Sequence, residues 1–341
     1  MKSKEKTISL YSRRASTWMK GLAIIMIVLS HFAEWWAWFF AEEGIRELLR
    51  DGISRCGPYG VAIFLLFSGY GLVKSAGEKR IDWRFVAKRF VSVYIPYLAI
   101  VTVINLLGGG FDFKNAGDFG KFLYGDDFWY MTVLFSFYLA FMTIWFMFTD
   151  THKRAVLMGV FTYWYSRHLY MTGEQDFWYI SNIAFLIGTL LALYESYIKK
   201  IIDRLGIILT VLFGAGSVMV VRAALYSEKI WEIPYEEAWS RISAIIVFTL
   251  FIACLAAVWK WYDPILPVFG RYSLYFYLTH TFLFMWTINN GNIHEEMRMR
   301  ILFAAGIIIV VSLVLGLLID ILMKPLQNVL KKEKNKDGIV V

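Results

Sequence analysis

Long apolar blocks alternate with short polar segments along nearly the whole 341-residue chain. Most of these blocks have the length that an α-helix needs to cross the hydrocarbon core of a bilayer, which is roughly 20 residues. The fifth block is shorter than this. We therefore predict an all-α integral membrane protein, a bundle of about ten transmembrane helices, at residues 18–40, 57–73, 85–107, 128–148, 155–165, 177–194, 206–225, 242–259, 264–288 and 301–323.

The charges of the connecting segments predict how the chain is oriented. Lys and Arg are enriched in the cytoplasmic loops of membrane proteins, and 24 of the 35 Lys and Arg residues fall in alternate segments on one side. We therefore predict both termini in the cytoplasm, with a basic N-terminus at 1–17, a membrane domain at 18–323 and a basic tail at 324–341. The opposite side carries acidic residues instead, namely Glu42, Glu43, Asp112, Asp118, Asp126, Asp127, Glu174, Glu232, Glu236 and Glu237.

Composition excludes an ordinary soluble domain, because 58% of the residues are hydrophobic and only 18% are charged. The net charge of +8 also occurs in nucleic-acid-binding proteins, but the excess of cytoplasmic Lys and Arg explains it, so we expect membrane lipids and no nucleic acid as partners. We expect the Lys331–Lys336 tail to lie on anionic lipid at the inner surface. Cys56 and Cys254 lack the spacing of a disulfide framework or a metal site, and neither is predicted.

The first apolar block contains the most informative pair of polar residues, Lys20 and His31. Eleven residues make about three helical turns, so the two side chains share one face and are roughly 16 Å apart along the axis. This places Lys20 at the cytoplasmic end and His31 near the middle of the bilayer, where ionisable groups are costly and usually functional. The alternative is a structural histidine bonded to a neighbouring helix and a lysine that reaches the interface. We favour the functional interpretation.

A second histidine, His280, follows Gly270 by ten residues, or roughly 15 Å of helix, and we expect it at a similar depth. The two histidines are therefore expected to meet, although His280 could equally brace the helix bundle through a hydrogen bond. Glu34 follows His31 by three positions and could orient the imidazole. It could also lie in the outer interface, since Trp35, Trp36 and Trp38 resemble an aromatic belt.

These residues fit acyl transfer from a thioester to a hydroxyl, a reaction that needs a base, donors for the oxyanion and a cationic site for an anionic donor. Histidine suits the first role, because its ordinary pKa of about 6.5 lies near working pH. Cytoplasmic cations suit the third role, although orientation of the chain also explains most of them. The candidates are Lys20, Lys74, Lys79, Arg80, Arg84, Lys88, Arg89 and Arg271.

Five sequence elements, taken in order, resemble the bacterial membrane acyltransferase family 3. The first is a basic residue followed by ten residues and a histidine (Lys20 to His31), and the second is a Gly-Val, aromatic and Ser-Gly pattern (Gly60 to Tyr70). The other three are a basic pair before a helix (Lys88-Arg89 to Pro96), an aromatic element (Phe128 to Tyr130), and a Gly, Ser, Tyr-Leu-x-His signature (Gly270 to His280). The resemblance covers nearly the whole chain.

The resemblance implies an acyl-coenzyme A donor, usually acetyl-coenzyme A, which binds from the cytoplasm as a substrate, so we expect no tightly bound cofactor. It also implies a glycan or lipid-linked sugar as the acceptor, and a place in the bacterial cytoplasmic membrane. We assign catalytic roles to His31, Glu34 and His280. We assign donor binding to Lys20, Ser68, Gly69, Lys88, Arg89 and Arg271.

The chain departs from the family pattern at three places. Lys20 stands where arginine is commoner, which keeps the charge but loses the bidentate fork. Ser92 and Val93 stand where a second arginine is often found, and Asp127 where histidine is often found. These departures concern donor binding more than the type of reaction. No esterase-like domain follows the last span, so we expect transfer to be completed in the membrane domain or by a partner.

Our hypothesis is therefore an O-acyltransferase in which His31 is the general base or a transient acyl acceptor, and Lys20 holds the donor. A transporter or flippase of a glycan or lipid-linked intermediate is the main alternative, since polar residues within the membrane also mark substrate paths. Transporters often show repeated halves, and the sequence shows no repeat. A membrane scaffold without catalytic activity gives no reason for polar residues at depth.

Overall fold

The computed structural model describes residues 9–39, 49, 52–77, 80–108, 116–125, 128–227, 234–260, 263–289 and 296–336, and all regular elements in these ranges are helical. The chain forms two compact units. The first comprises Met1–Lys79 and Met147–Arg271, and the second Arg80–Phe146 and Tyr272–Val341. Several residues that the sequence places in connecting segments lie outside the described residues, namely Glu42, Glu43, Lys79, Asp112, Asp126, Asp127 and Glu232.

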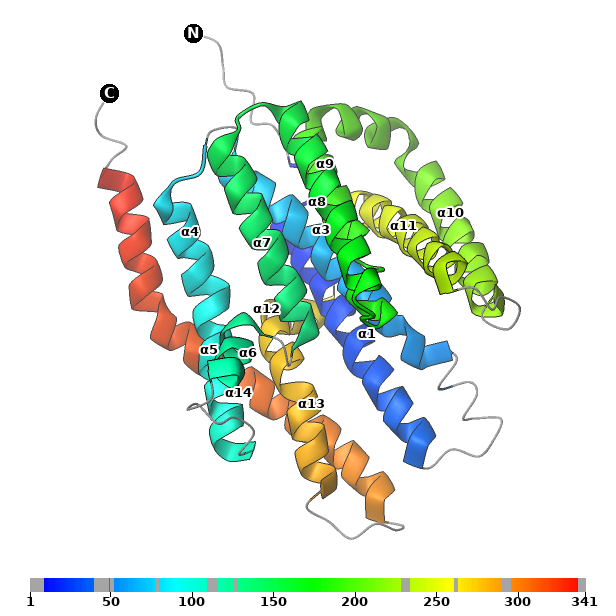
Figure 1. The fold of residues 1–341 in the computed structure, drawn as a ribbon, viewed down its shortest axis with the longest axis vertical. Coiled ribbons are helices and arrows are strands. Elements are labelled where there is room, and N and C mark those ends of the chain that lie inside the picture. The colour runs from blue at the N-terminus through cyan, green and yellow to red at the C-terminus, as the bar shows by residue number, and fades with distance from the viewer. Residues whose placement is uncertain are drawn as a thin grey trace. The chain divides into compact units, whose positions relative to one another are not determined.

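The first unit is a helical bundle in which α3 lies against both α1 and α9, α10 pairs with α11, and α12 lies on α1. In Figure 1, α10 and α11 appear as a pair of long helices running side by side. The elements of this unit are α1 (Arg13–Phe39), η2 (Ile53–Cys56), α3 (Gly57–Ala76), α8 (Thr151–Met171), η4 (Asp176–Trp178), α9 (Ile183–Leu193), α10 (Glu195–Ser227), α11 (Pro234–Val258) and α12 (Leu266–Arg271).

Helix α3 is the most buried span of the first unit, and its sequence explains its limits. Pro58 lies in its first turn, where its missing N–H costs nothing. The helix ends at Gly77, which has a φ of 69° and donates its N–H to the carbonyl of Val73 at 2.9 Å. This left-handed conformation favours glycine because a side chain would crowd the backbone.

The second unit begins with a helical stretch that changes its winding part-way. Asp82 caps α4 by accepting a hydrogen bond from the N–H of Phe85 at 3.0 Å. At its other end, α13 packs on α14, and the hydroxyls of Thr279 and Ser312 lie 2.7 Å apart between them. The elements are α4 (Trp83–Arg89), the π-helical η3 (Phe90–Tyr94), α5 (Ile95–Gly108), α6 (Ala116–Tyr124), α7 (Trp129–Met147), α13 (Ser273–Asn289) and α14 (Glu296–Lys336).

Eight helical stretches of the described chain are long and apolar enough to cross a membrane, and they coincide with eight of the ten predicted spans. The all-helical, multi-pass character of the protein is therefore confirmed. The eight are Arg13–Ala37, Ile53–Ala76, Trp83–Leu107, Trp129–Met147, Asp176–Leu193, Glu195–Ala223, Ala238–Val258 and Phe303–Pro325.

The other two predicted spans take a different form. Residues 155–165 lie within α8, which has 21 residues and is therefore about 31 Å long, but which carries polar side chains such as those of Arg154, Arg167 and His168. Residues 264–288 are divided between α12 and α13, which belong to different units. The count of ten and the cytoplasmic position of both termini stay predictions.

Candidate functional site

Lys20 and His31 lie on one unbroken helix, α1, as their spacing predicts. The imidazole Nδ1 of His31 is 3.9 Å from the carboxylate Oε2 of Glu34, and the ring stacks on Trp35 with 5.7 Å between centroids. The side chain of His31 is 36% exposed, and its access to a substrate stays a prediction. Glu34 is thus placed beside the imidazole, as its three-residue spacing on the helix predicts.

His280 has a different environment, on α13 in the second unit. Its ring is buried at 2% exposure, and Nδ1 lies 2.7 Å from the carbonyl oxygen of Tyr277 and 3.0 Å from that of Phe276. Because carbonyls only accept, Nδ1 carries the hydrogen, and Nε2 is then the accepting nitrogen, 3.3 Å from the hydroxyl of Thr281. His31 belongs to the other unit, so the meeting of the two histidines stays a prediction.

Two of the predicted donor-binding cations flank one helix crossing in the first unit. Helix α12 touches α1 so closely that a Cβ atom at Gly21 would overlap the carbonyl oxygen of Leu266, and one at Gly270 would overlap that of Thr17. Lys20 directly precedes Gly21, and Arg271 directly follows Gly270. The fold therefore brings the backbone next to Lys20 close to the backbone next to Arg271, although the two residues are far apart in the sequence.

A hydrogen bond from α1 fixes the entrance to α12. The indole Nε1 of Trp18 donates to Oδ2 of Asp263 at 2.5 Å, while Oδ1 accepts the N–H groups of Ile265 and Leu266, both at 2.8 Å. The hydrogen bond from Leu266 and that from Trp18 lower the pKa of the Asp263 carboxyl from its usual value of 3.8. Asp263 is therefore ionised at neutral pH, and both its oxygens are engaged.

A family model described as an acyltransferase domain matches residues 13–319, which is most of the chain and spans both units. The chain belongs to acyltransferase family 3. The match includes Lys20, His31 and His280, and it confirms the resemblance drawn from the sequence motifs. Neither a curated protein nor a solved structure matches the chain.

In this acyltransferase, the Ser68-Gly69 pair lies in the middle of α3, at the crossing with α9. A Cβ atom at Gly69 would overlap the carbonyl oxygen of Phe185, and one at Gly188 would overlap that of Leu66. The absence of a side chain at Gly69 is thus needed for helix packing. Ser68 is half-buried on the same turn. Donor binding by Ser68 and Gly69 stays a prediction.

The predicted Lys88-Arg89 pair ends α4 in the second unit of the acyltransferase. Lys88 is exposed, whereas the guanidinium of Arg89 lies 5.4 Å from the centre of the Phe85 ring. The Nε of Arg89 is buried, with no hydrogen-bond partner among the described residues. The π-helical turn that follows contains Ser92, and such turns are frequent at functional sites. Contact between this pair and the donor stays a prediction.

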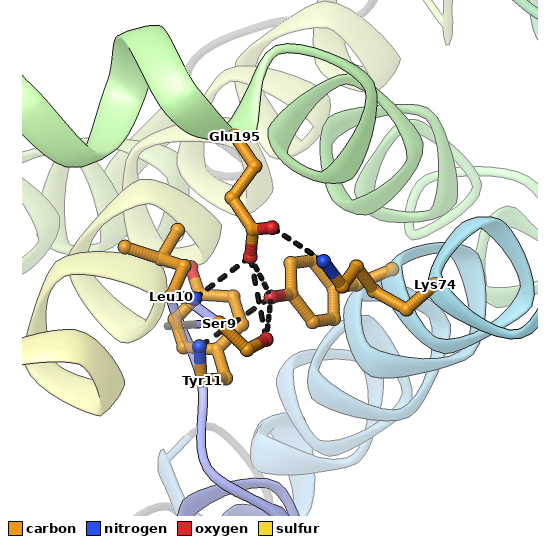
Figure 2. Close-up of polar contacts among 6 residues, drawn as sticks. Ser9, Leu10, Tyr11, Lys74 and Glu195 are labelled. Atoms are coloured by element: carbon orange, nitrogen blue, oxygen red, sulfur yellow. Dashed lines mark hydrogen bonds and ion pairs between the residues drawn. The ribbon is translucent and has the colours of Figure 1, made fainter. Parts of the chain in front are cut away.

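The structure also contains a buried polar cluster that the sequence analysis did not single out, centred on Glu195 at the start of α10 (Figure 2). Its Oε2 lies 2.5 Å from Nζ of Lys74. Its Oε1 accepts hydrogen bonds from the hydroxyl of Tyr70, from the N–H of Leu10 at 2.7 Å and from the hydroxyl of Ser9 at 3.3 Å. The one available signal was an acidic residue at the cytoplasmic end of a predicted span, where basic residues prevail.

This cluster fastens the segment before α1 to the bundle. The ring of Tyr11 packs edge-on against Phe67 and Tyr70, and its hydroxyl donates to the carbonyl oxygen of Ala253 at 3.1 Å. Burial raises the pKa of Tyr11 well above 10.0, which keeps the hydroxyl protonated as a donor. Lys74, a candidate for donor binding, forms an ion pair within the cluster, and a role in donor binding stays a prediction.

The two cysteines lie apart, Cys56 in η2 and Cys254 in α11, and both are free thiols. In the part of the chain that the structure describes, no three His, Cys, Asp or Glu side chains are grouped as a metal site.

Proposed function

We propose that this membrane acyltransferase transfers an acyl group from cytoplasmic acyl-coenzyme A to a hydroxyl of an extracytoplasmic or lipid-linked glycan. We expect the group to be acetyl, the membrane to be the bacterial cytoplasmic membrane, and the chain to cross it ten times with both termini inside. The observation that carries the proposal is the arrangement on α1. A partly exposed imidazole beside a carboxylate shares a helix face with a lysine three turns away, in a chain of the acyltransferase family.

The proposed reaction uses His31 as a general base. The neutral imidazole takes the proton of the acceptor hydroxyl while the oxygen attacks the thioester carbonyl, and the Glu34 carboxylate at 3.9 Å stabilises the imidazolium. The tetrahedral intermediate then expels the thiolate, which takes the proton back from His31. The products are an ester and free coenzyme A. In a second version, His31 first receives the acyl group itself and passes it to the hydroxyl.

Lys20 and Arg271 would hold the phosphates of coenzyme A, because both flank the crossing of α1 and α12. Cations bind phosphate through charge-assisted hydrogen bonds, which are stronger than neutral ones. Such binding lowers the KM for the donor without itself changing the chemical step.

The test is consumption of radiolabelled acetyl-coenzyme A by purified protein in liposomes that contain the acceptor. We expect His31→Ala to lower turnover at least about 100-fold, the usual effect of losing a general base, and Lys20→Ala to raise the KM for the donor. His168→Ala is the control, since His168 is exposed on α8. Wild-type turnover by a correctly inserted His31→Ala protein contradicts the assignment, and glycan movement without thioester consumption indicates a transporter instead.

A further inference from the structure

The hydrogen bond between Trp18 and Asp263 ties a short helix to the helix that carries the proposed chemistry. Both carboxylate oxygens of Asp263 accept hydrogen bonds, Oδ2 from the indole of Trp18 on α1 and Oδ1 from the N–H groups of Ile265 and Leu266 at the start of α12. Trp18 lies two positions before Lys20. A substitution of Asp263 therefore alters contacts both at the start of α12 and close to Lys20 in the sequence of α1.

Helix α12 depends on such contacts for its position. It has only six residues, and helices of this length are not stable by themselves in water. Its two glycine contacts, Gly270 with Thr17 and Leu266 with Gly21, allow it to approach α1 at backbone distance but form no hydrogen bond between side chains. The Trp18–Asp263 bond adds a polar contact between α1 and the residues that begin α12.

The position of α12 sets the spacing of two charges. Arg271 is the last residue of α12, and Lys20 lies on α1 beside Gly21, so a shift of α12 along α1 changes the distance between the two cations. A donor with several phosphates needs its cationic partners at a fixed separation, because each misplaced charge forfeits a charge-assisted hydrogen bond.

We propose that Trp18 and Asp263 are positioning residues for the acyl donor, which hold Lys20 and Arg271 at the separation that the phosphates of an acyl thioester require. The inference rests on the proposed function. We expect the Trp18–Asp263 bond to affect the affinity for the donor and not the chemical step. Trp18 is not adjacent to His31 on α1, and Asp263 lies outside α1.

The test uses two conservative variants of the full-length protein in nanodiscs. Trp18→Phe removes the N–H donor together with part of the ring system, and Asp263→Asn removes the charge. Trp164→Phe and Asp203→Asn, at exposed positions of the same unit, are matched controls for the loss of ring volume and of charge. The readouts are KM and kcat for acetyl-coenzyme A and the Kd of free coenzyme A by calorimetry. We expect the KM and the Kd to rise about 10-fold, as befits one hydrogen bond to a charged group, with kcat changed less than about 2-fold.

A double variant distinguishes positioning from a general loss of structure. If the bond acts through Lys20, Trp18→Phe adds little to the KM of a Lys20→Ala protein, because coupled effects are not additive. Full additivity, or a fall in kcat at unchanged KM, overturns the proposal. Should Asp263→Asn not fold, Asp263→Glu keeps the charge and displaces it, with the same expected rise in KM.

Measurements on the wild-type protein distinguish failure of the proposed function from failure of the positioning role alone. If it neither binds nor consumes acetyl-coenzyme A, the proposed function fails and this inference fails with it. If the wild type is active and the two variants bind coenzyme A as tightly as their controls, only the positioning role is wrong.

Discussion

Glu195 and Lys74 form an ion pair with 2.5 Å between Oε2 and Nζ, joining the start of α10 to the last turn of α3. The carboxylate side chain is 9% exposed, whereas the ammonium side chain is 37% exposed. The other oxygen of Glu195 holds the backbone of Leu10, so one acidic residue connects three segments of the first unit.

Replacing Glu195 by Gln is expected to destabilise the protein. The neutral amide of Gln attracts the ammonium of Lys74 less than a carboxylate does, and only its carbonyl oxygen can accept hydrogen bonds. Because Lys74 is partly solvated, we expect a loss of about 1–2 kcal/mol, less than for a fully buried pair. Thermal unfolding in detergent measures it, with Glu174→Gln at an exposed position as the control. An unfolding temperature equal to that of the control would show that the ion pair contributes nothing.

Replacing Tyr70 by Phe is expected to loosen the segment before α1. The tyrosine hydroxyl donates to Glu195 and lies 2.7 Å from the hydroxyl of Ser9, and both contacts are lost without changing the ring. Hydrogen exchange of the peptide that contains Leu10 should become about 10-fold faster, which corresponds to the loss of about one hydrogen bond. Tyr197→Phe is the control, since Tyr197 is 68% exposed. Unchanged exchange at Leu10 contradicts the prediction.

Replacing Gly69 by Ala distinguishes a role of this residue in helix packing from a role in donor binding. Its Cβ would overlap the carbonyl oxygen of Phe185, so we expect a loss of stability of about 1–3 kcal/mol, the usual cost of overpacking. Gly71→Ala is a matched control on the same helix, because no atom lies within 4 Å of a Cβ there. Normal stability with a raised KM for the donor would instead support the donor-binding role predicted from the Ser68-Gly69 motif.

Two substitutions at His280 distinguish a catalytic role from a purely structural one, in which the ring only stabilises α13. The amide nitrogen of Asn can replace Nδ1 as donor to the carbonyl oxygens of Phe276 and Tyr277, whereas His280→Ala leaves those carbonyls without it. If His280 only braces α13, the Asn variant should retain most of the stability and activity, and the Ala variant should lose both. A folded but inactive Asn variant would identify Nε2 as a catalytic atom. Circular dichroism and turnover of acetyl-coenzyme A are the measurements.

The contribution of Asp263 to stability should depend on pH. Hydrogen bonds from Leu266 and Trp18 lower the pKa of its carboxyl from 3.8, so the folded state binds this proton less tightly than the unfolded state does. The stabilisation is therefore complete above about pH 5 and is lost as the pH falls through the lowered pKa. We expect Asp263→Asn to unfold at a lower temperature than wild type at pH 7, and the difference to shrink below about pH 4. A difference that is constant with pH would show that the charge has no role.

The pairing of Lys20 with His31 could be predicted from the sequence because both lie on one helix, whose period fixes which residues share a face. The Glu195 cluster could not, because its partners Ser9 and Tyr70 are 186 and 125 positions away and no local pattern relates them. The sequence also did not predict that α12 and α13 are two separate helices. Hydropathy reports apolar surface and not the course of the backbone, so residues 264–288 read as one continuous block.

The glycine contacts of α3 have a mechanical consequence. A Cβ atom at Gly60 would overlap the carbonyl oxygen of Ala23 on α1, and those at Gly69 and Gly188 would overlap backbone of the facing helices α9 and α3. Because backbone atoms approach so closely at these points, sliding or rolling of α1, α3 and α9 against one another is restricted. During a reaction cycle these three helices should move as one rigid body. Any opening within the first unit should therefore come from movement of the helices around them.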